Sequence, residues 1–285
     1  MLNFVPYLIL VAISMSSFVI LLFQKRSTWP LFLLLAYSGM IYLFEFFIFV
    51  CFNSYRYIPQ VVSIPYYDNA VGAIISNLLS VPVAATYITV YRLSWIWIIC
   101  LAFLFGGIEL LFLRLGVYEQ SWWRTIYTIV ALLFFFLLAR KWPSWLSRGK
   151  RVFKLVTLAM FAWSIVATLV FLFALSGIRI FHIGLFQDPY HDDIFVSAIY
   201  CFIIAIILTI GVSVPRHPWS SSASLFIIFA MQIVLIRIGL LKILILLWQY
   251  WLINVSCYCI ILGIVLAGNH KLEKKTSRRI SSNNR

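Results

Sequence analysis

Three polar side chains in otherwise apolar stretches are the first candidates for chemistry. Glu45, Asn77 and Glu109 each lie inside a hydrophobic run long enough to cross a membrane. Ionisable side chains within a bilayer are costly, and they commonly mark ion, proton or ligand pathways. A rise of about 1.5 Å per helical residue, counted from Phe52, Asp68 and Gly116 at the expected outer ends, places all three roughly 10–13 Å below the outer surface. We therefore interpret them as a ligand- or proton-binding group.

The surroundings of Glu109 indicate burial but leave its role open. Gly106 and Gly116 lie three residues before it and seven after it, and therefore on the same helical face. Stripes of small residues let helices approach closely and mark interior faces. Glu109 could bind a cation or proton there, or it could be a protonated packing residue that hydrogen-bonds Asn77 or a backbone carbonyl. Pro82 is expected to bend its helix near Asn77 and to free a carbonyl group.

Four arginines fall near the expected outer ends of apolar runs. They are Arg56, Arg114, Arg179 and Arg237. One interpretation is a rim that steers anions, because guanidinium groups bind phosphate and carboxylate well. The alternative is that these arginines form ion pairs with Asp68 and Asp192 of the outer loops. The sequence supports both interpretations.

Metal and catalytic motifs give little support for an enzyme. His191, Asp192 and Asp193 are candidate ligands for a divalent cation, which prefers oxygen ligands. No Gly-rich phosphate loop, H-E-x-x-H or C-x-x-C motif occurs, and no nucleophile–base pair can be assigned. We therefore expect no catalytic residue and no cofactor. The aromatic residues, 18% of the chain, are interpreted as lipid-facing and core residues.

The composition defines the class of protein that must position these residues. The chain has 285 residues, of which 64% are hydrophobic and 11% are charged. Soluble domains carry about 25% charged residues, and a water-soluble fold could not bury this much apolar surface. The composition therefore excludes soluble enzymes, secreted domains and disordered proteins, and it predicts an all-α integral membrane protein.

Nine runs are long enough to cross about 30 Å of hydrocarbon. They cover residues 4–23, 29–52, 70–91, 94–116, 124–140, 154–176, 194–214, 222–240 and 244–267. Basic residues gather at 140–154 and 271–285, whereas the loop 177–193 is acidic. Because Lys and Arg accumulate on the inner side, we expect the N-terminus outside and the C-terminus in the cytoplasm. We interpret the chain as a multi-pass protein of the bacterial plasma membrane.

The net charge of +14 bears on the expected partners. Positive segments beside membrane spans attract anionic lipid headgroups, so membrane lipids are the expected partners of the inner segments. The basic tail is expected to be solvated and disordered, and it could dock a protein partner. We expect no binding of nucleic acid.

The second half of the chain repeats landmarks of the first. The segment from Arg56 to Asp68 recurs as Arg179 to Asp192, with one residue inserted, and later landmarks keep an offset of 123–124 residues. This pattern predicts two parallel four-helix repeats preceded by one extra helix. The predicted parts are the N-terminal helix and turn 1–28, the first repeat 29–141, the linker 142–151, the second repeat 152–267 and the tail 268–285.

The two predicted repeats differ at the polar positions. Thr168, Cys201 and Gln232 stand where the first repeat has Glu45, Asn77 and Glu109. A purely architectural role would more naturally be kept in both halves. The asymmetry therefore favours a functional site in the first repeat.

Each repeat resembles a family of small four-helix, multi-pass membrane proteins of unknown function, mostly from spore-forming Gram-positive bacteria. The residues that carry the resemblance in the first repeat are Pro65, Asp68, Glu109, Gly116, Trp122 and Trp123. The second repeat has Pro189, Asp192, Gln232, Gly239 and Trp248, so that a glutamine stands where the acid would be. The resemblance implies a helical membrane fold and no particular activity.

Three classes of function follow from these observations. The preferred hypothesis is binding or translocation of a small ligand, proton or lipid headgroup at an outward-opening pocket in the first repeat. A second hypothesis is a membrane-embedded enzyme acting on lipid-linked substrates, with Glu109 as general acid or base. A third is a structural or regulatory membrane partner protein that docks through its basic linker and tail.

Overall fold

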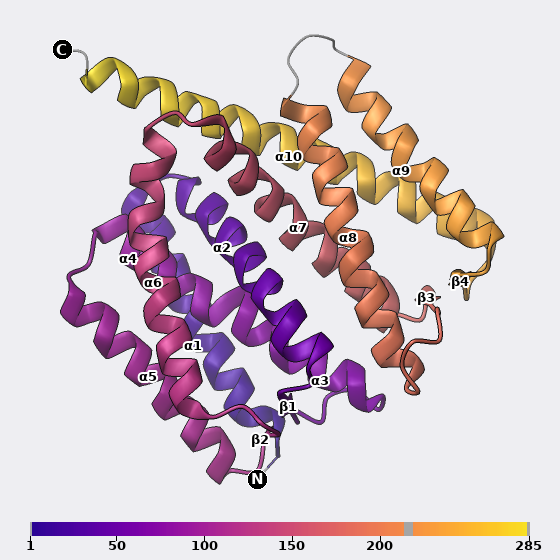
Figure 1. Cartoon of the computed structure of the whole chain (residues 1–285), viewed down its shortest axis with the longest axis horizontal. Helices are drawn as coiled ribbons and strands as arrows, with labels where there is room; N and C mark the ends of the chain where they lie inside the picture. Colours follow the sequence, from indigo (N-terminus) through magenta and orange to yellow (C-terminus); the bar gives the residue numbers. More distant parts are fainter. Residues whose placement is uncertain (1, 214–218, 284–285) are drawn as a thin grey trace. The chain divides into compact units, whose positions relative to one another are not determined.

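The computed structural model describes residues 2–213 and 219–283, with side chains described up to residue 274. Within these residues, nine helices are long and apolar enough to cross a membrane. This confirms the all-α, multi-pass organisation that the composition predicts (Figure 1). The chain divides into two compact units, Met1–Arg148 (unit 1) and Gly149–Arg285 (unit 2).

Unit 1 contains five of the nine apolar spans. The first is α1 (Phe4–Lys25), the second joins α2 (Trp29–Glu45) to the π-helix η1 (Phe46–Cys51), and the third joins α3 (Pro65–Ile74), the π-helix η2 (Ile75–Ser80) and α4 (Val81–Tyr91). The last two are α5 (Trp95–Arg114) and α6 (Thr125–Ser147). Two short strands, β1 (Tyr55–Tyr57) and β2 (Tyr118–Gln120), pair antiparallel outside these spans.

Unit 2 contains the other four spans. They are α7 (Arg151–Leu175), α8 (Pro189–Ser213), α9 (Trp219–Arg237) and α10 (Leu247–Asn283). Strand β3 (Arg179–Phe181) follows α7 and pairs antiparallel with β4 (Leu241–Ile243), which separates α9 from α10. The eighth and ninth spans are therefore separate helices.

Several helix ends differ from the hydropathy prediction. The third and seventh spans begin at Pro65 and Pro189 rather than at residues 70 and 194. Proline is favoured in the first turn of a helix. The polar residues that follow each proline lower the local hydropathy, so the hydropathy prediction began each span later. Helix α6 continues to Ser147 with Pro143 inside it, so the expected linker 142–151 is largely helical. Helix α10 spans Leu247–Asn283 and so includes much of the expected tail 268–285.

The packing of each unit centres on a few helices. In unit 1, α4 packs against both α2 and α6. Tyr37 of α2 is fully buried; its hydroxyl lies 3.0 Å from the Ala139 carbonyl and 2.7 Å from the Thr89 hydroxyl. In unit 2, α8 packs against α7 and α9 and buries Ile204 and Leu208 completely. The membrane-spanning helices thus hold each unit together through side-chain packing.

The loops before α3 and α8 make equivalent hydrogen bonds. The Asp68 carboxylate accepts from the backbone N–H groups of Gln60, Val61 and Val62, at 2.7–3.0 Å. The Asp192 carboxylate accepts from four backbone N–H groups at 2.6–3.4 Å, and these belong to Ile183, Gly184, Leu185 and Phe186. Three of these donors, and the acceptor itself, lie 124 residues after their counterparts in unit 1.

Arg56 and Arg179, which the sequence comparison matched, have different positions in their two-stranded ribbons. Tyr55 pairs with Gln120 at one end of the first ribbon, and Arg179 pairs with Ile243 at the same end of the second. Arg179 therefore takes the place of Tyr55, not that of Arg56. Because neighbouring strand residues point to opposite faces, this shift explains why Arg56 is exposed whereas Arg179 is buried.

Candidate functional site

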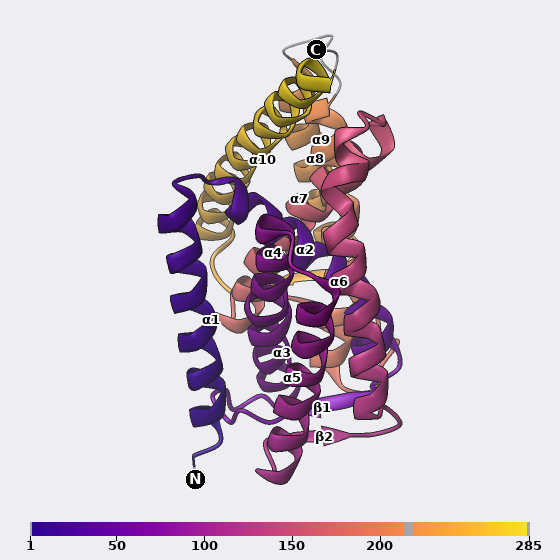
Figure 2. The same ribbon diagram turned by 90° about the vertical axis from the view of Figure 1, so that its left-hand side faces the viewer.

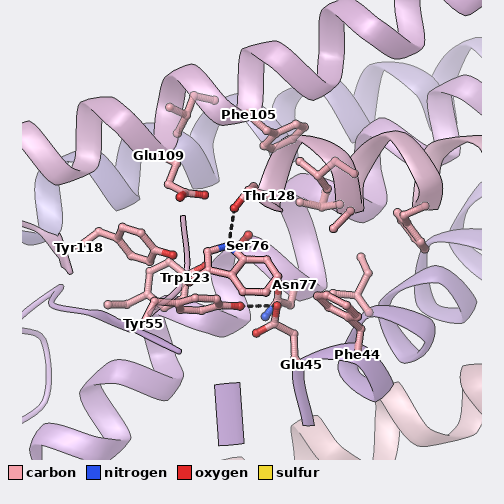
Figure 3. Close-up of a pocket in the computed structure, with 18 of the residues that line it drawn as sticks. Phe44, Glu45, Tyr55, Ser76, Asn77, Phe105, Glu109, Tyr118, Trp123 and Thr128 are labelled. Carbon is pink, nitrogen blue, oxygen red and sulfur yellow. Dashed lines mark hydrogen bonds between the residues drawn. The ribbon is translucent and has the colours of Figure 1, made fainter. Parts of the chain in front are cut away.

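Glu45, Asn77 and Glu109 all line one cavity within unit 1, which encloses about 280 Å³ (Figure 3). All five spans of the unit and both of its strands contribute to the walls. Figure 2 shows β1 and β2 at the same end of unit 1 as the N-terminus of the chain. Three positions that the sequence places in separate helices at similar depth are thus brought together around one space.

Glu45 is the last residue of α2, directly before the π-helix η1. Such π-helical segments are rare, and they occur frequently at functional sites. The Tyr55 hydroxyl donates a hydrogen bond of 2.6 Å to Glu45 Oε1 (Figure 3). The other carboxylate oxygen, Oε2, is buried and has no hydrogen-bond partner among the described residues. The carboxylate therefore retains an unused acceptor in the cavity wall.

Asn77 lies in the second π-helix, η2, and is 5% exposed. It lies beside the Glu45 carboxylate in the close-up (Figure 3). Pro82 lacks the N–H group that would bond the Leu78 carbonyl, and the Ser38 hydroxyl donates to that carbonyl instead, at 3.2 Å. The carbonyl expected to be freed by Pro82 is thus bonded by α2, and Leu78 does not line the cavity.

Glu109 lies on α5 and is half-buried. Its Oε1 accepts hydrogen bonds from Gln120 Nε2 at 2.5 Å and from the Thr125 hydroxyl at 3.0 Å. These donors come from β2 and from the start of α6, and neither was expected from the sequence. Gly106, on the same face, lets α6 approach, because an added Cβ would lie 2.7 Å from Ile129 Cγ1. Glu109 therefore lies where α5, α6 and β2 meet.

Aromatic side chains form much of the cavity wall. Ten of its 24 lining residues are aromatic: Tyr7, Phe44, Tyr55, Tyr57, Phe105, Phe112, Tyr118, Trp123, Phe134 and Phe135. The Tyr55 ring lies 5.5 Å from that of Tyr118 and 5.9 Å from that of Trp123, and the Tyr57 and Tyr118 rings are 5.0 Å apart. Five of these residues, Tyr7, Tyr55, Phe112, Tyr118 and Trp123, are buried core residues, as expected, and they also line the cavity.

The tyrosines of the two strands remain neutral phenols. Burial raises the pKa of Tyr55, Tyr57 and Tyr118 well above the ordinary value. The Glu45 carboxylate raises the pKa of Tyr55 and Tyr57 further, because it disfavours a second negative charge nearby. Each hydroxyl can therefore donate a hydrogen bond, as Tyr55 does. The alternation Tyr-Arg-Tyr at 55–57 was the available sequence signal for this wall, since alternation is typical of a strand.

The four arginines proposed as a rim differ in their exposure. Arg56, Arg114 and Arg237 are exposed, and none of them lines the cavity. Arg179 is only 2% exposed; it forms an ion pair with Asp193 and donates to the Val170 carbonyl at 2.6 Å. Arg179 is therefore a buried structural residue, and its partner is not the expected Asp192.

The candidate metal ligands are directed to other partners. The Asp192 carboxylate accepts backbone N–H groups, the Asp193 carboxylate binds Arg179, and His191 stacks on Phe186 with ring centroids 3.8 Å apart. Among the described residues, no group of three His, Cys, Asp or Glu side chains could hold a metal ion. The described geometry therefore gives no support to a metal site at His191, Asp192 and Asp193.

Comparison with known proteins gives no family for this arrangement. The resemblance of each half to small four-helix membrane proteins remains a prediction from the sequence. The chain matches no protein-family profile, no curated protein and no solved structure.

Proposed function

We propose that this protein binds, and in a transport cycle translocates, a small ligand, proton or lipid headgroup at the cavity of unit 1. The observation that carries the proposal is the unpartnered Oε2 of Glu45 in the wall of a partly open cavity that a second carboxylate also lines. Buried polar atoms are almost always hydrogen-bonded, and a carboxylate that lacks a partner is costly. A bound ligand or proton supplies the missing interaction.

We further propose that the two units arose by duplication and that unit 1 carries the function. The shared order of helices and strands and the matching loop hydrogen bonds support the duplication. Unit 2 has Gln232 and Cys201 where the sequence comparison places Glu109 and Asn77. Gln232 is 1% exposed and donates to the Tyr200 hydroxyl at 2.6 Å. A carboxylate is thus absent from these positions in unit 2, which favours a ligand role over an architectural role for the acids of unit 1.

The proposed setting is the bacterial plasma membrane, with the N-terminus outside and the C-terminus in the cytoplasm. In this orientation the strands β1 and β2 lie at the outer side, because they share an end of unit 1 with the N-terminus (Figure 2). We propose that the cavity is reached from this outer side and that the basic segment 140–154 faces anionic headgroups of the inner leaflet.

Native mass spectrometry of gently solubilised protein tests the proposal. Wild type is compared with Glu45→Gln, Glu109→Gln and a matched control, Glu119→Gln, whose carboxylate is exposed on β2 and does not line the cavity. We expect a retained adduct in wild type and in the control, and its loss from both cavity variants. Folded proteins without an adduct, or an adduct that neither cavity substitution removes, would contradict the proposal. Covalently changed lipid in the extract would instead favour an enzyme.

A further inference from the structure

The chemistry of the cavity wall restricts the class of ligand. Resting on the proposed function, we infer that the ligand is an organic cation with a substituted ammonium group, about the size of a single aromatic ring with its substituents. The carboxylates of Glu45 and Glu109 supply the negative charge, and the aromatic side chains supply the surface on which the cation lies.

The charge of the wall has one sign. Glu45 and Glu109 are the ionisable carboxylates of the wall, and none of its described residues is Lys, Arg or His. Tyr55 donates a hydrogen bond to Glu45, and Gln120 and Thr125 donate to Glu109. The neutral side chains of Asn77 and Thr128 also interact with Glu45 and Glu109, respectively. The three donors satisfy Oε1 of each residue but bring no positive charge. Because buried charges are normally paired, a cation that enters the space provides the missing counter-charge, whereas an anion would add repulsion.

The aromatic rings favour an organic cation. A substituted ammonium over the face of Tyr or Trp is attracted by the negative potential of the ring, and this attraction is strongest where water is excluded. Tyr55 contacts both Tyr118 and Trp123 through its ring and donates its hydroxyl to Glu45. Figure 3 shows these rings between the carboxyl groups of Glu45 and Glu109. A cation in this space therefore meets ring faces and carboxylate oxygens together.

A metal ion fits the wall less well than an organic cation. Ca²⁺ takes about six to eight oxygen ligands, and Mg²⁺ keeps a shell of ordered water. Apart from the two carboxylates and the tyrosines, the polar side chains of the wall are Ser76, Asn77, Thr128 and Trp123, and the Trp123 N–H group is already donated to Thr128 at 2.7 Å. A substituted ammonium needs few polar contacts, because its alkyl groups pack against apolar residues.

The volume indicates the size of the ligand. The cavity encloses about 280 Å³. Cavities of about 150 Å³ hold a benzene molecule, and sites for drug-sized ligands enclose about 300–1,000 Å³. One aromatic ring with a trimethylammonium group suits this range, whereas a larger multi-ring cation would require the wall to move.

Calorimetry with two ring compounds of opposite charge tests the inference. Phenyltrimethylammonium and benzenesulfonate are titrated into wild type, Glu45→Gln, Glu109→Gln and Glu119→Gln in the same detergent, and thermal unfolding verifies the fold of each variant. We expect phenyltrimethylammonium to bind wild type and Glu119→Gln within a factor of two, and each cavity variant at least tenfold more weakly. Benzenesulfonate should show no binding to any of them.

The outcomes separate this inference from the proposed function. Equal or tighter binding of benzenesulfonate, no binding of phenyltrimethylammonium to wild type, or affinity unchanged in both folded cavity variants would overturn the organic-cation class. If the mass of the adduct identifies a neutral or anionic ligand, and its retention depends on Glu45 and Glu109, the organic-cation class would also be overturned. The cavity would then remain a binding site for another class of ligand. Absence of both an adduct and probe binding would remove both proposals.

A substituted ammonium is carried both by free organic cations and by zwitterionic lipid headgroups. The two sources are distinguished by repeating the titration in nanodiscs of phosphatidylglycerol alone and in nanodiscs that also contain phosphatidylethanolamine. Competition by phosphatidylethanolamine assigns the cavity to a lipid headgroup. Equal affinity in both membranes assigns it to a free cation.

Discussion

Replacing the loop aspartates by asparagine gives a stability prediction that can be worked out bond by bond. Asparagine keeps one acceptor oxygen and puts an amide NH₂ group in place of the other. In Asp68→Asn the oxygen that accepts from Val61 and Val62 can be kept, but the bond from Gln60 is lost. In Asp192→Asn two bonds are lost whichever oxygen is kept, because each carboxylate oxygen accepts two.

The expected losses differ between the two loops. A hydrogen bond to a charged group contributes about 1.5–3 kcal/mol, so the free energy of unfolding should fall by this amount in Asp68→Asn. In Asp192→Asn two hydrogen bonds are lost, so the free energy of unfolding should fall by about 3–5 kcal/mol. The upper figure is below twice 3 kcal/mol because one of the four bonds is long, at 3.4 Å. Equilibrium unfolding in mixed micelles of mild detergent and sodium dodecyl sulfate, followed by tryptophan fluorescence, measures both losses.

Asp188→Asn provides the matched control. Asp188 is exposed and accepts a hydrogen bond of 2.9 Å from the Tyr190 N–H group at the start of α8. Asparagine caps a helix about as well as aspartate, so the stability should change by less than about 0.5 kcal/mol. Losses in Asp68→Asn and Asp192→Asn that are no larger than that of the control would refute the assignment of these carboxylates as loop-closing acceptors.

Two further predictions concern packing. Gly72→Ala should lower the free energy of unfolding by about 3 kcal/mol, because the added Cβ would collide with Tyr57 Cβ. Gly116→Ala should cost only about 1–2 kcal/mol, because Gly116 has φ of 69° but no neighbour within 4 Å of an added Cβ. The same unfolding titration compares them, and equal losses would contradict the close approach of α3 to β1. Arg179→Met should cost about 3–5 kcal/mol by removing the cation that neutralises the buried Asp193 carboxylate, and adding Asp193→Asn should restore part of the loss. A double variant no more stable than the single variant would argue against the buried ion pair.

The membrane spans could be predicted from sequence, because their signal is local. A run of about 20 apolar residues is needed to cross a bilayer, and the structure has an apolar helix at each of the nine predicted runs. The similar distances of Glu45, Asn77 and Glu109 from the expected outer ends of their helices could also be estimated from sequence, because the rise per residue of a helix is fixed. Their meeting around one cavity depends on helix packing, which hydropathy does not report.

Other features could not be predicted, because their sequence signal is short or long-range. Strands β1 and β2 have three residues each and lie 60 residues apart. Hydropathy averaged over a window as long as a membrane span does not detect such short strands. The part of the cavity wall formed by Tyr55 and Tyr118 was therefore not predicted. Arg179 is buried because it has the strand position of Tyr55, one residue away from that of Arg56. Matching the arginines of the two halves in the sequence did not reveal this difference. The partners of Glu109, from β2 and α6, are side chains that the spacing within α5 cannot identify.

The central claim, an accessible cavity that favours cations in unit 1, is tested most directly by thiol labelling at Ser76, which lines the cavity from η2. Ser76→Cys is made in protein whose native cysteines are replaced, with Ser121→Cys as an exposed control. Methanethiosulfonate reagents of similar size carry either a trimethylammonium or a sulfonate group. We predict that the cationic reagent labels the thiol introduced at position 76 at least tenfold faster, relative to the control position, and that phenyltrimethylammonium protects it. Equal rates for the two reagents, or no labelling of this thiol while the control reacts, would contradict the account.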